Sequence, residues 1–402
     1  MEDSSDSKKK TMEEDEKKVE ALTDVWWWVS GSLGAVLALV VSAFVGSWLT
    51  KFIISACVMG FIFMLFLSGV TCYQYHKDQN EPSGSSLVVV FRVVKAAISN
   101  RHLPMIKKID SDPVTSSPEI PCTRWIDKAI SSILTGEAEE ETVCTATQVK
   151  EVKELIGMIP MWAIFFLYCI VKATGSTFFV LQFDNLDPSI GGFKVPLIAF
   201  FLIQPASEYT IKYLYQLVVQ KWWSNAQPLR VMKVKIGLGI WCSFLSCVTA
   251  RLVEARRLSL IEERGYGDYD DQTINMSVFW LAPQFCLLGF MQGLTEDGVV
   301  DFYYYKVAAS LKSYGPSFNE FVIGIGKFIS VFYVLTFKTW FGHTINSSHL
   351  DNYYGILAIL SLGNLVIIYG YVSVYVYRDV EGEDKSLHST MEEVVTQADA
   401  AE

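Results

Sequence analysis

The sequence predicts an all-α protein that crosses a membrane several times. Hydrophobic residues make up 51% of its 402 residues and charged residues only 19%, whereas a soluble chain carries about 25% charged residues. The mean hydropathy is accordingly positive, at +0.29. The apolar residues occur in long runs, and only helices and closed barrels satisfy every backbone hydrogen bond in lipid. Because the runs are too long for strands, we expect a polytopic bundle of helices in a lipid bilayer.

Eight runs are long enough to span a bilayer. Each contains roughly 18 to 26 residues, which matches a hydrocarbon core about 30 Å thick. Only Thr50 and Lys51 separate the first two runs, so these two helices should form a tight hairpin. The predicted spans are Val25–Leu49, Phe52–Cys72, Leu155–Val180, Val195–Val219, Ile236–Val253, Val278–Gly298, Phe318–Trp340 and Tyr353–Tyr377.

The distribution of Lys and Arg predicts the orientation of these spans. Residues 1–24 are polar, rich in lysine and without a cleavable signal peptide. The segment 73–154 is also rich in basic residues, so both regions should be cytoplasmic, and eight spans would place the C-terminus inside as well. The predicted outer loop Glu254–Ser277 contains three arginines and departs from this tendency. Glycosylation sequons at Asn275 and Asn346 fall on predicted outer loops.

The segment 73–154 separates two groups of spans. Its residues Leu87–Ser99 form an amphipathic helical pattern. We expect a cytoplasmic linker that lies on the membrane surface, or alternatively a solvated tether without a role of its own. The apolar side of the pattern consists of Val88, Phe91, Val94 and Ile98. The predicted organisation is a polar N-terminus (1–24), two helices (25–72), the linker (73–154), six helices (155–380) and a disordered acidic tail (381–402).

Ionisable residues inside the spans indicate function, because each costs about 2.5–3.5 kcal/mol to insert. Lys172 in the third span has no carboxylate one turn away, so its partner should come from another helix, water or a ligand. Glu208 and Lys212 in the fourth span are four residues apart, in the order that favours an intrahelical ion pair. This pair either lines a polar path or serves packing alone.

Two further spans also carry polar residues. Glu320 and Lys327 lie two turns apart on one face of the seventh span. Gln292, Glu296 and Asp297 lie near the inner end of the sixth span, and the two carboxylates fit a position at the cytoplasmic interface. Together, the charges predict a polar path between the helices.

Other classes of function find little support in the sequence. The net charge of −10 excludes a strongly basic nucleic-acid-binding protein. The eight cysteines form no CxxC pair, and the five histidines have no metal-site spacing, so we expect no metal, no cofactor and no catalytic residues. The glycine pairs Gly237/Gly239 and Gly324/Gly326, and the Gly289-x-x-x-Gly293 motif, should be positions of close helix packing.

Short motifs in a fixed order cover most of the C-terminal part of the chain. They are CTATQVKEVKELIGMIPMW (Cys144–Trp162), GSTFF (Gly175–Phe179), IGGFKVP (Ile190–Pro196), SVFWLAPQF (Ser277–Phe285), DFYY (Asp301–Tyr304), LKSYG (Leu311–Gly315), GIGKF (Gly324–Phe328) and HLDNYY (His349–Tyr354). In this order they resemble the plant nitrate/peptide transporter family, a branch of the proton-dependent oligopeptide transporters in the major facilitator superfamily. WWW at Trp26–Trp28 and FRVVKAAISNRHLP in the linker resemble the same family.

The resemblance implies a partial major facilitator fold, which consists of two six-helix halves around a central cavity. The eight spans would correspond to helices five to twelve, so the family's first four helices would be missing from this sequence. The family's ExxER motif, which is associated with proton coupling, does not occur in it.

The chain also departs from the family at positions near the expected cavity. Gln292 aligns with a glutamate that contacts substrate in relatives, and Lys327 replaces a small residue of GxGSF. Lys172 occupies what looks like a cavity-lining position. A cation there favours an anion, so we expect a small anion such as nitrate or an organic acid. The predicted substrate-binding residues are Lys172, Gln292, Lys327 and Glu320.

Two functions remain open at this point. The first is proton-coupled symport of a small solute (nitrate, another small anion or a peptide-like compound) by alternating access, in the plasma membrane or the vacuolar membrane. The second is a truncated, transport-inactive relative that associates with intact transporter chains and regulates them. A gene product whose upstream exons are missing would give the same sequence as the second.

Overall fold

The computed structural model describes a helical protein. It describes residues 26, 29–31, 33–41, 44–45, 47–69, 86–99, 125–126, 145–190, 193–223, 226–265, 274–307, 309–342 and 344–371. The described helices of eight or more residues include α2 (Trp48–Gly69), α3 (Ser86–Ser99), α5 (Ala146–Ile156), α6 (Ile159–Ser176), α7 (Phe178–Asn185), α8 (Leu197–Trp222), α9 (Pro228–Arg264), α10 (Ala282–Lys306) and α11 (Gly315–Thr336). A further helix covers Leu350–Tyr371.

The described strands are short. β1 (Leu186–Asp187) pairs in parallel with β4 (Ile274–Ser277), and β2 (Ser189–Ile190) pairs antiparallel with β3 (Phe193–Lys194). They connect helices and do not form a core, so the predicted all-α class is confirmed.

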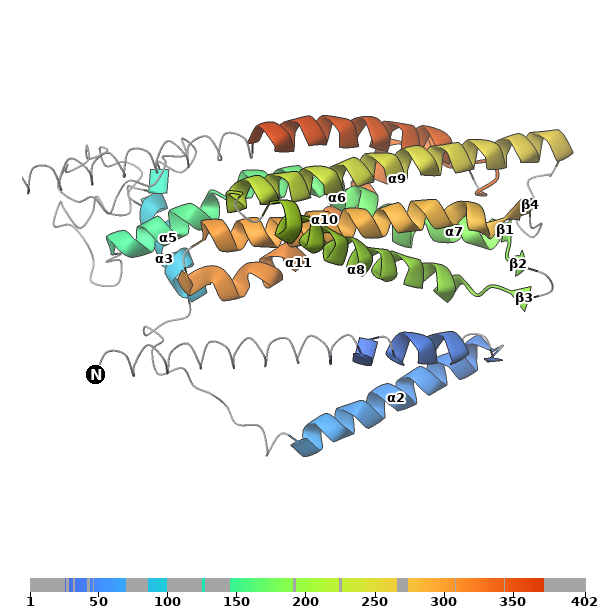
Figure 1. The fold of residues 1–402 in the computed structure, drawn as a ribbon, viewed down its shortest axis with the longest axis horizontal. Helices are drawn as coiled ribbons and strands as arrows, with labels where there is room; N and C mark the ends of the chain where they lie inside the picture. Colours follow the sequence, from blue (N-terminus) through green and yellow to red (C-terminus); the bar gives the residue numbers. More distant parts are fainter. Residues whose placement is uncertain are drawn as a thin grey trace, which may run out of the picture. The chain divides into compact units, whose positions relative to one another are not determined.

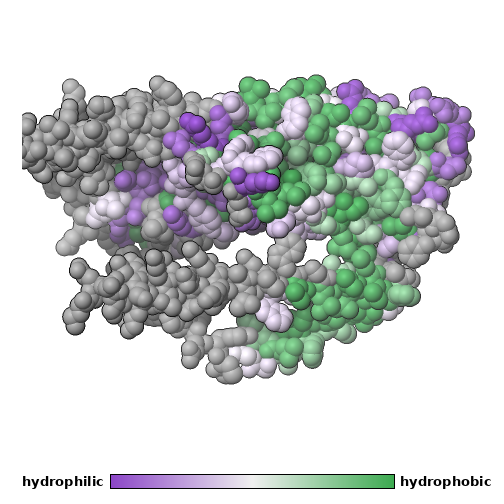
Figure 2. Space-filling model, viewed as in Figure 1, coloured by the Kyte–Doolittle hydropathy of each residue, from purple (hydrophilic) through white to green (hydrophobic). Residues whose placement is uncertain are grey.

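The chain divides into two compact units. The described part of the first contains α2, the β2–β3 hairpin and the first turn of α8. The second contains α3, α5 to α7, the remainder of α8, α9 to α11 and the last helix. Within the second unit, α6, α9, α10 and α11 run alongside one another (Figure 1). Apolar side chains cover most of the middle of this unit, and hydrophilic ones gather towards its ends (Figure 2).

Six helices in the described part of the chain are long and apolar enough to cross a membrane. α8 covers the predicted span Val195–Val219 and has 26 residues. It is less apolar than the six because Gln204, Glu208 and Lys212 interrupt it. Part of the predicted span Val25–Leu49 lies outside the described residues. The six spans are Leu49–Gly69, Phe165–Asn185, Pro228–Arg264, Val278–Lys306, Gly315–Thr336 and Leu350–Tyr371.

The predicted third span, Leu155–Val180, is interrupted twice. α5 starts with a capping box at Thr145 and ends before Gly157. α6 then begins with Pro160 in its first turn, where the missing N–H of proline is tolerated. A second break at Thr177 separates α6 from α7.

The predicted span Ile236–Val253 is much shorter than the helix that contains it. α9 has 37 residues and ends at Gly265, which adopts the left-handed conformation with φ of 64°. The expectation that an outer loop starts at Glu254 is therefore wrong, because the helix continues through Arg264. Hydropathy detected only the part of α9 that is apolar enough for the bilayer core.

Glycines set the close contacts between the helices. A Cβ on Gly289 would lie 2.2 Å from the backbone oxygen of Gln204, so α10 packs directly on α8. Gly239 faces Thr295 and Gly326 faces Cys169 in the same way. A Cβ on Gly237 or Gly324 would meet no atom within 4 Å, so only one glycine of each predicted GxG pair packs closely.

The linker contains the predicted amphipathic helix, but with a different buried side. α3 packs on α5 through Val93, Ala96 and Ala97, which form a buried cluster with Ile126, Val149 and Val152. Val88, Phe91 and Ile98 of the predicted apolar side are exposed. Val94, the fourth residue of the predicted side, packs against this cluster, so α3 carries apolar residues on both a buried and an exposed side.

Candidate functional site

The Lys172 side chain forms an ion pair between two helices. Its Nζ lies 2.5 Å from Oε1 of Glu296, so a residue of α6 meets one of α10. The hydroxyl of Tyr168, one turn before Lys172, donates to the same oxygen at 2.7 Å. The Lys172 and Glu296 side chains are only 17% and 13% exposed. Glu296 is thus a partner of Lys172 within the bundle, not an isolated carboxylate at an interface.

A second ion pair lies on α8. Oε1 of Glu208 and Nζ of Lys212 are 2.9 Å apart, and both side chains are partly exposed. The backbone of Glu208 approaches α10 at Gly293, where a Cβ would lie 2.7 Å from its oxygen. Glu296 and Asp297 both act electrostatically on Lys212. The two ion pairs therefore share one neighbourhood.

Gln292 lies one turn before Glu296 on α10 and also faces α8. Nε2 of Gln204 donates a hydrogen bond of 2.7 Å to Oε1 of Gln292. Both amide side chains are half-buried. The amide of Gln292 thus extends the polar stripe between α8 and α10 by one turn.

α11 contributes an exposed cation. Lys327 follows Gly326, which packs on Cys169 of α6. The charged groups of Lys172, Glu296 and Lys327 all interact electrostatically with the thiol of Cys169, so all three lie in its neighbourhood. Lys327 makes no ion pair with any residue that the structure describes. Glu320, also exposed, lies two turns away on α11 and makes no ion pair with the other predicted site residues in the described part of the chain.

The described interactions place Lys172, Gln292 and Lys327 around the junction of α6, α8, α10 and α11, and none of them includes Glu320. We name this junction the charged cluster and define it by Lys172, Glu208, Lys212, Gln292, Glu296 and Lys327.

A third group of charges joins α9 to α10. Lys235 pairs with Asp297 and, at 2.7 Å, with Asp301. The two aspartates are four residues apart and thus lie on one face of α10. Asp297 was predicted to lie at the cytoplasmic interface, whereas Lys235 and Asp301 were not predicted as site residues, although the four-residue spacing of the two aspartates is a detectable signal.

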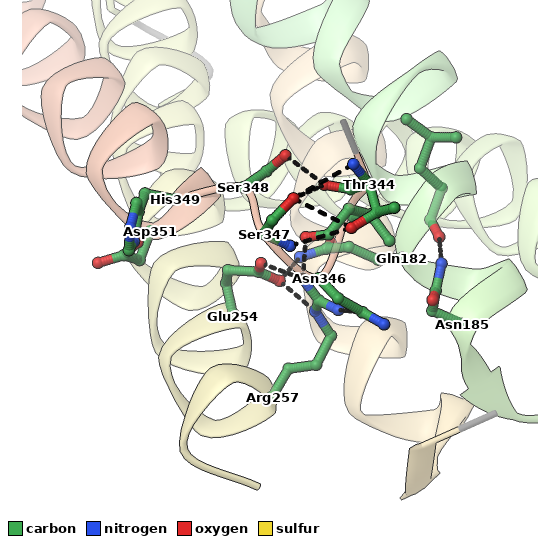
Figure 3. Close-up of polar contacts among 12 residues, drawn as sticks. Gln182, Asn185, Glu254, Arg257, Thr344, Asn346, Ser347, Ser348, His349 and Asp351 are labelled. Carbon is green, nitrogen blue, oxygen red and sulfur yellow. Dashed lines mark hydrogen bonds and ion pairs between the residues drawn. The ribbon is translucent and has the colours of Figure 1, made fainter. Parts of the chain in front are cut away.

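A buried network that the sequence pattern did not predict lies at the end of the unit where α9 meets β4 (Figure 3). Glu254 and Arg257 are 0% exposed and pair through two hydrogen bonds of 2.9 and 2.7 Å. Arg257 also donates to the side chain of Asn346 and to the backbone oxygen of Ile345. Gln182 of α7 donates to Glu254 at 2.7 Å. The two charged residues were assigned to an outer loop, so their spacing on a helix was not considered.

The charged cluster gathers charged and amide side chains at a partly exposed region of the helices. It combines two ion pairs, an amide pair and an additional ammonium group. Within the described residues, no group of His, Cys, Asp and Glu could hold a metal ion.

The family model described as "POT family" matches residues 10–349. Among curated proteins, Protein NRT1/ PTR FAMILY 5.16 of Arabidopsis thaliana is 29% identical over 378 residues, which cover 89% of this chain and 65% of that protein. Protein NRT1/ PTR FAMILY 5.6 of the same organism is 28% identical over 383 residues, which cover 88% and 64%. The chain thus spans less than two thirds of the length of these relatives.

A solved structure has the same fold. The in meso crystal structure of the POT family transporter PepTSo matches with a TM-score of 0.53 and 13% sequence identity. The match covers 85% of this chain and 68% of that chain.

Proposed function

This chain belongs to the POT family, and from that premise we propose that it is a multi-pass membrane transporter which moves a small solute together with protons by alternating access. The single observation that best supports this proposal is the charged cluster. Ionisable side chains on α6, α8, α10 and α11 gather in one partly exposed region, although each is costly to place in a membrane.

The charged cluster supports a small anion, such as nitrate, or a peptide-like compound as the solute. The partner of Lys172 is Glu296 on another helix, so the charge of Lys172 is already compensated in this structure. Lys327, by contrast, has no carboxylate partner among the residues that the structure describes. We therefore propose Lys327 as a direct contact for an anionic group, with the amide of Gln292 as a neutral hydrogen-bonding partner and Lys172 as a cation whose availability depends on Glu296.

Reconstitution of the 402-residue chain in lipid vesicles tests the proposal. An inward proton gradient should drive uptake of labelled nitrate, and a protonophore should abolish it. Empty vesicles and vesicles without a gradient are the controls. Absence of uptake by correctly folded protein would contradict transport by this chain and favour the alternative of a regulatory membrane protein that associates with other transporter chains.

A further inference from the structure

We propose that the turn between α8 and α9 binds the headgroup of one anionic phospholipid from the cytoplasmic leaflet of the membrane. The site consists of Lys221, Trp222 and Trp223 where α8 ends and of Arg230 in the first turn of α9. We name these four residues the basic turn. They lie outside the charged cluster, and their binding of lipid does not depend on the proposed transport.

The sequence around the basic turn contains cations and no carboxylates. Residues 209–253 include no Asp or Glu. Lys221 and Arg230 are both exposed, and neither forms an ion pair with a residue that the structure describes. The two cations are therefore available to a negatively charged group from outside the chain.

The next two cations of α9 already have partners. Lys235 pairs with Asp297 and Asp301 of α10. The ammonium group of Lys233 lies 3.7 Å from the centroid of the Tyr369 ring in the last helix. The carboxylates of α10 are thus engaged by Lys235 and leave the cations of the basic turn to another anion.

Two exposed tryptophans indicate that the basic turn lies at the depth of lipid headgroups. Trp222 and Trp223 are 72% and 38% exposed and directly follow Lys221. Tryptophan favours the boundary between hydrocarbon and water, and a long lysine side chain can extend from there to a headgroup. The acyl chains of a phospholipid can also cover the exposed indole rings, which a soluble anion cannot do.

The start of α9 also favours an anion. The N-cap residue Gln227 makes no side-chain capping hydrogen bond, and the first turn contains Arg230 but no acidic residue. The N-terminal end of a helix carries a partial positive charge, so a cation at this end is unfavourable without a counter-ion. One headgroup phosphate would compensate both the guanidinium group and the helix end.

Contacts between helices hold the basic turn together and identify its side of the membrane. The hydroxyl of Tyr215 on α8 donates to the backbone oxygen of Val231 on α9 at 2.7 Å. Tyr371, two residues after the ring that contacts Lys233, donates to the backbone oxygen of Gly157 at 3.1 Å. α9 therefore starts at the end of the unit where α5 ends. Because the linker that contains most of α5 is predicted to be cytoplasmic, the lipid should come from the cytoplasmic leaflet.

Native mass spectrometry of the purified full chain tests the site by titration with phosphatidylserine and, separately, with zwitterionic phosphatidylcholine. We expect one phosphatidylserine to bind saturably and more tightly than phosphatidylcholine. Lys221→Gln and Arg230→Gln should each lower the affinity for phosphatidylserine about fivefold, the factor that one basic residue near a membrane surface contributes. Neither should change the affinity for phosphatidylcholine. Trp222→Ala should weaken the binding of both lipids by a similar factor.

Lys312→Gln is the matched control. Lys312 is an exposed lysine of η6 (Ala309–Tyr314), which is held against the end of α10 by the hydrogen bond from Tyr303 to the backbone oxygen of Leu311. This variant should bind phosphatidylserine as tightly as the parent chain does. Because every substituted residue is exposed, thermal unfolding should give the melting temperature of the parent chain for each variant.

Four results would overturn the inference. The first is an equal affinity of the parent chain for the two lipids, and the second is an unchanged affinity for phosphatidylserine in both Lys221→Gln and Arg230→Gln. The third is an equal loss in Lys312→Gln, which would show a general effect of net charge instead of a site. The fourth is displacement of phosphatidylserine by an equal concentration of glycerol 3-phosphate, which would assign the basic turn to a soluble phosphate.

Discussion

At the residue scale, the buried charged side chains of the described helices form ion pairs with identified partners. The burial of each pair determines the role that its charges can have. Glu254 and Arg257 show the extreme case, because both are completely buried and joined by two hydrogen bonds. They hold the segment around Asn346 and receive a hydrogen bond from Gln182. The ion pair of Lys172 and Glu296, by contrast, is partly exposed.

Removing Arg257 should strongly destabilise the protein. Arg257→Met leaves the carboxylate of Glu254 buried without its counter-charge, so we expect a loss of about 3–5 kcal/mol. Thermal unfolding in detergent measures this loss. Arg256→Met is the matched control, because Arg256 is exposed on the same helix and should change stability by less than about 0.5 kcal/mol. Equal effects of the two substitutions would show that the buried network contributes nothing specific.

Removing the positive charge of Lys327 should weaken anion uptake without affecting folding. Lys327→Ser removes an exposed ammonium, whose attraction to an anion at close range is about 1 kcal/mol in water. The KM for nitrate in vesicles should therefore rise about fivefold, and the melting temperature should stay constant. Lys338→Ser, which removes another exposed lysine after α11, should leave the KM unchanged. A KM that is also unchanged in Lys327→Ser would remove this residue from the site.

At the scale of helices, the contact between α8 and α10 depends on the absence of side chains. Gly289 and Gly293 bring the α10 backbone against the oxygens of Gln204 and Glu208. The close approach places Gln292 and Glu296 of α10 within reach of the polar residues of α8. The glycines therefore position the charged cluster as well as pack the helices.

A methyl group at this contact should force the two helices apart. In Gly289→Ala, the new Cβ would meet a backbone oxygen at 2.2 Å, so we expect a destabilisation of about 1–3 kcal/mol. The control is Gly324→Ala on α11, where nothing lies within 4 Å and the substitution should stabilise the helix by about 0.5–1 kcal/mol. Thermal unfolding of both variants measures these changes in stability. A Gly289→Ala protein as stable as the parent chain would contradict the close contact between α8 and α10.

The ends of the helices were harder to predict from sequence than their existence. Apolar runs identified α9, but its length of 37 residues includes polar ends that hydropathy does not detect. The breaks at Gly157 and Thr177 were not predicted, because long apolar runs continue around them and hide local signals such as Pro160 and Gly175. Apolar composition reports the part of a helix that lies in lipid, whereas caps, prolines and contacts determine where the helix begins and ends.

At the scale of the whole molecule, sequence motifs predicted the family and the helical membrane fold, and both are confirmed. The four-residue spacing of Glu208 and Lys212 predicted an ion pair within one helix, and Oε1 of Glu208 and Nζ of Lys212 are 2.9 Å apart in the structure. The partner of Lys172 could not be predicted from the sequence, because Glu296 is 124 residues away and only the packing of α6 on α10 brings the two side chains together. A single sequence reveals the periodicity within one helix, but it does not reveal which residues of different helices are in contact.

The two ends of the second unit should be accessible from opposite sides of the membrane. Lys150 lies on α5 and Arg264 at the far end of α9 (Figure 1). Cysteines introduced at these positions in a chain without native cysteines should react from opposite sides with a membrane-impermeant maleimide. Labelling of Arg264→Cys from outside intact cells, and of Lys150→Cys only after permeabilisation, is the expected result. Labelling of both from the same side would contradict the orientation inferred from the basic residues.

The distance in sequence between Lys172 and Glu296 also has a consequence for biosynthesis. A ribosome that adds about 5–20 residues per second needs about 6–25 seconds to reach Glu296 after it has made Lys172. During that interval, α6 has left the ribosome with an ammonium group that has no permanent counter-charge. Glu208 and Lys212, by contrast, can neutralise each other as soon as α8 forms. We therefore expect α6 to insert into lipid at a higher energetic cost than α8 until α10 has been made.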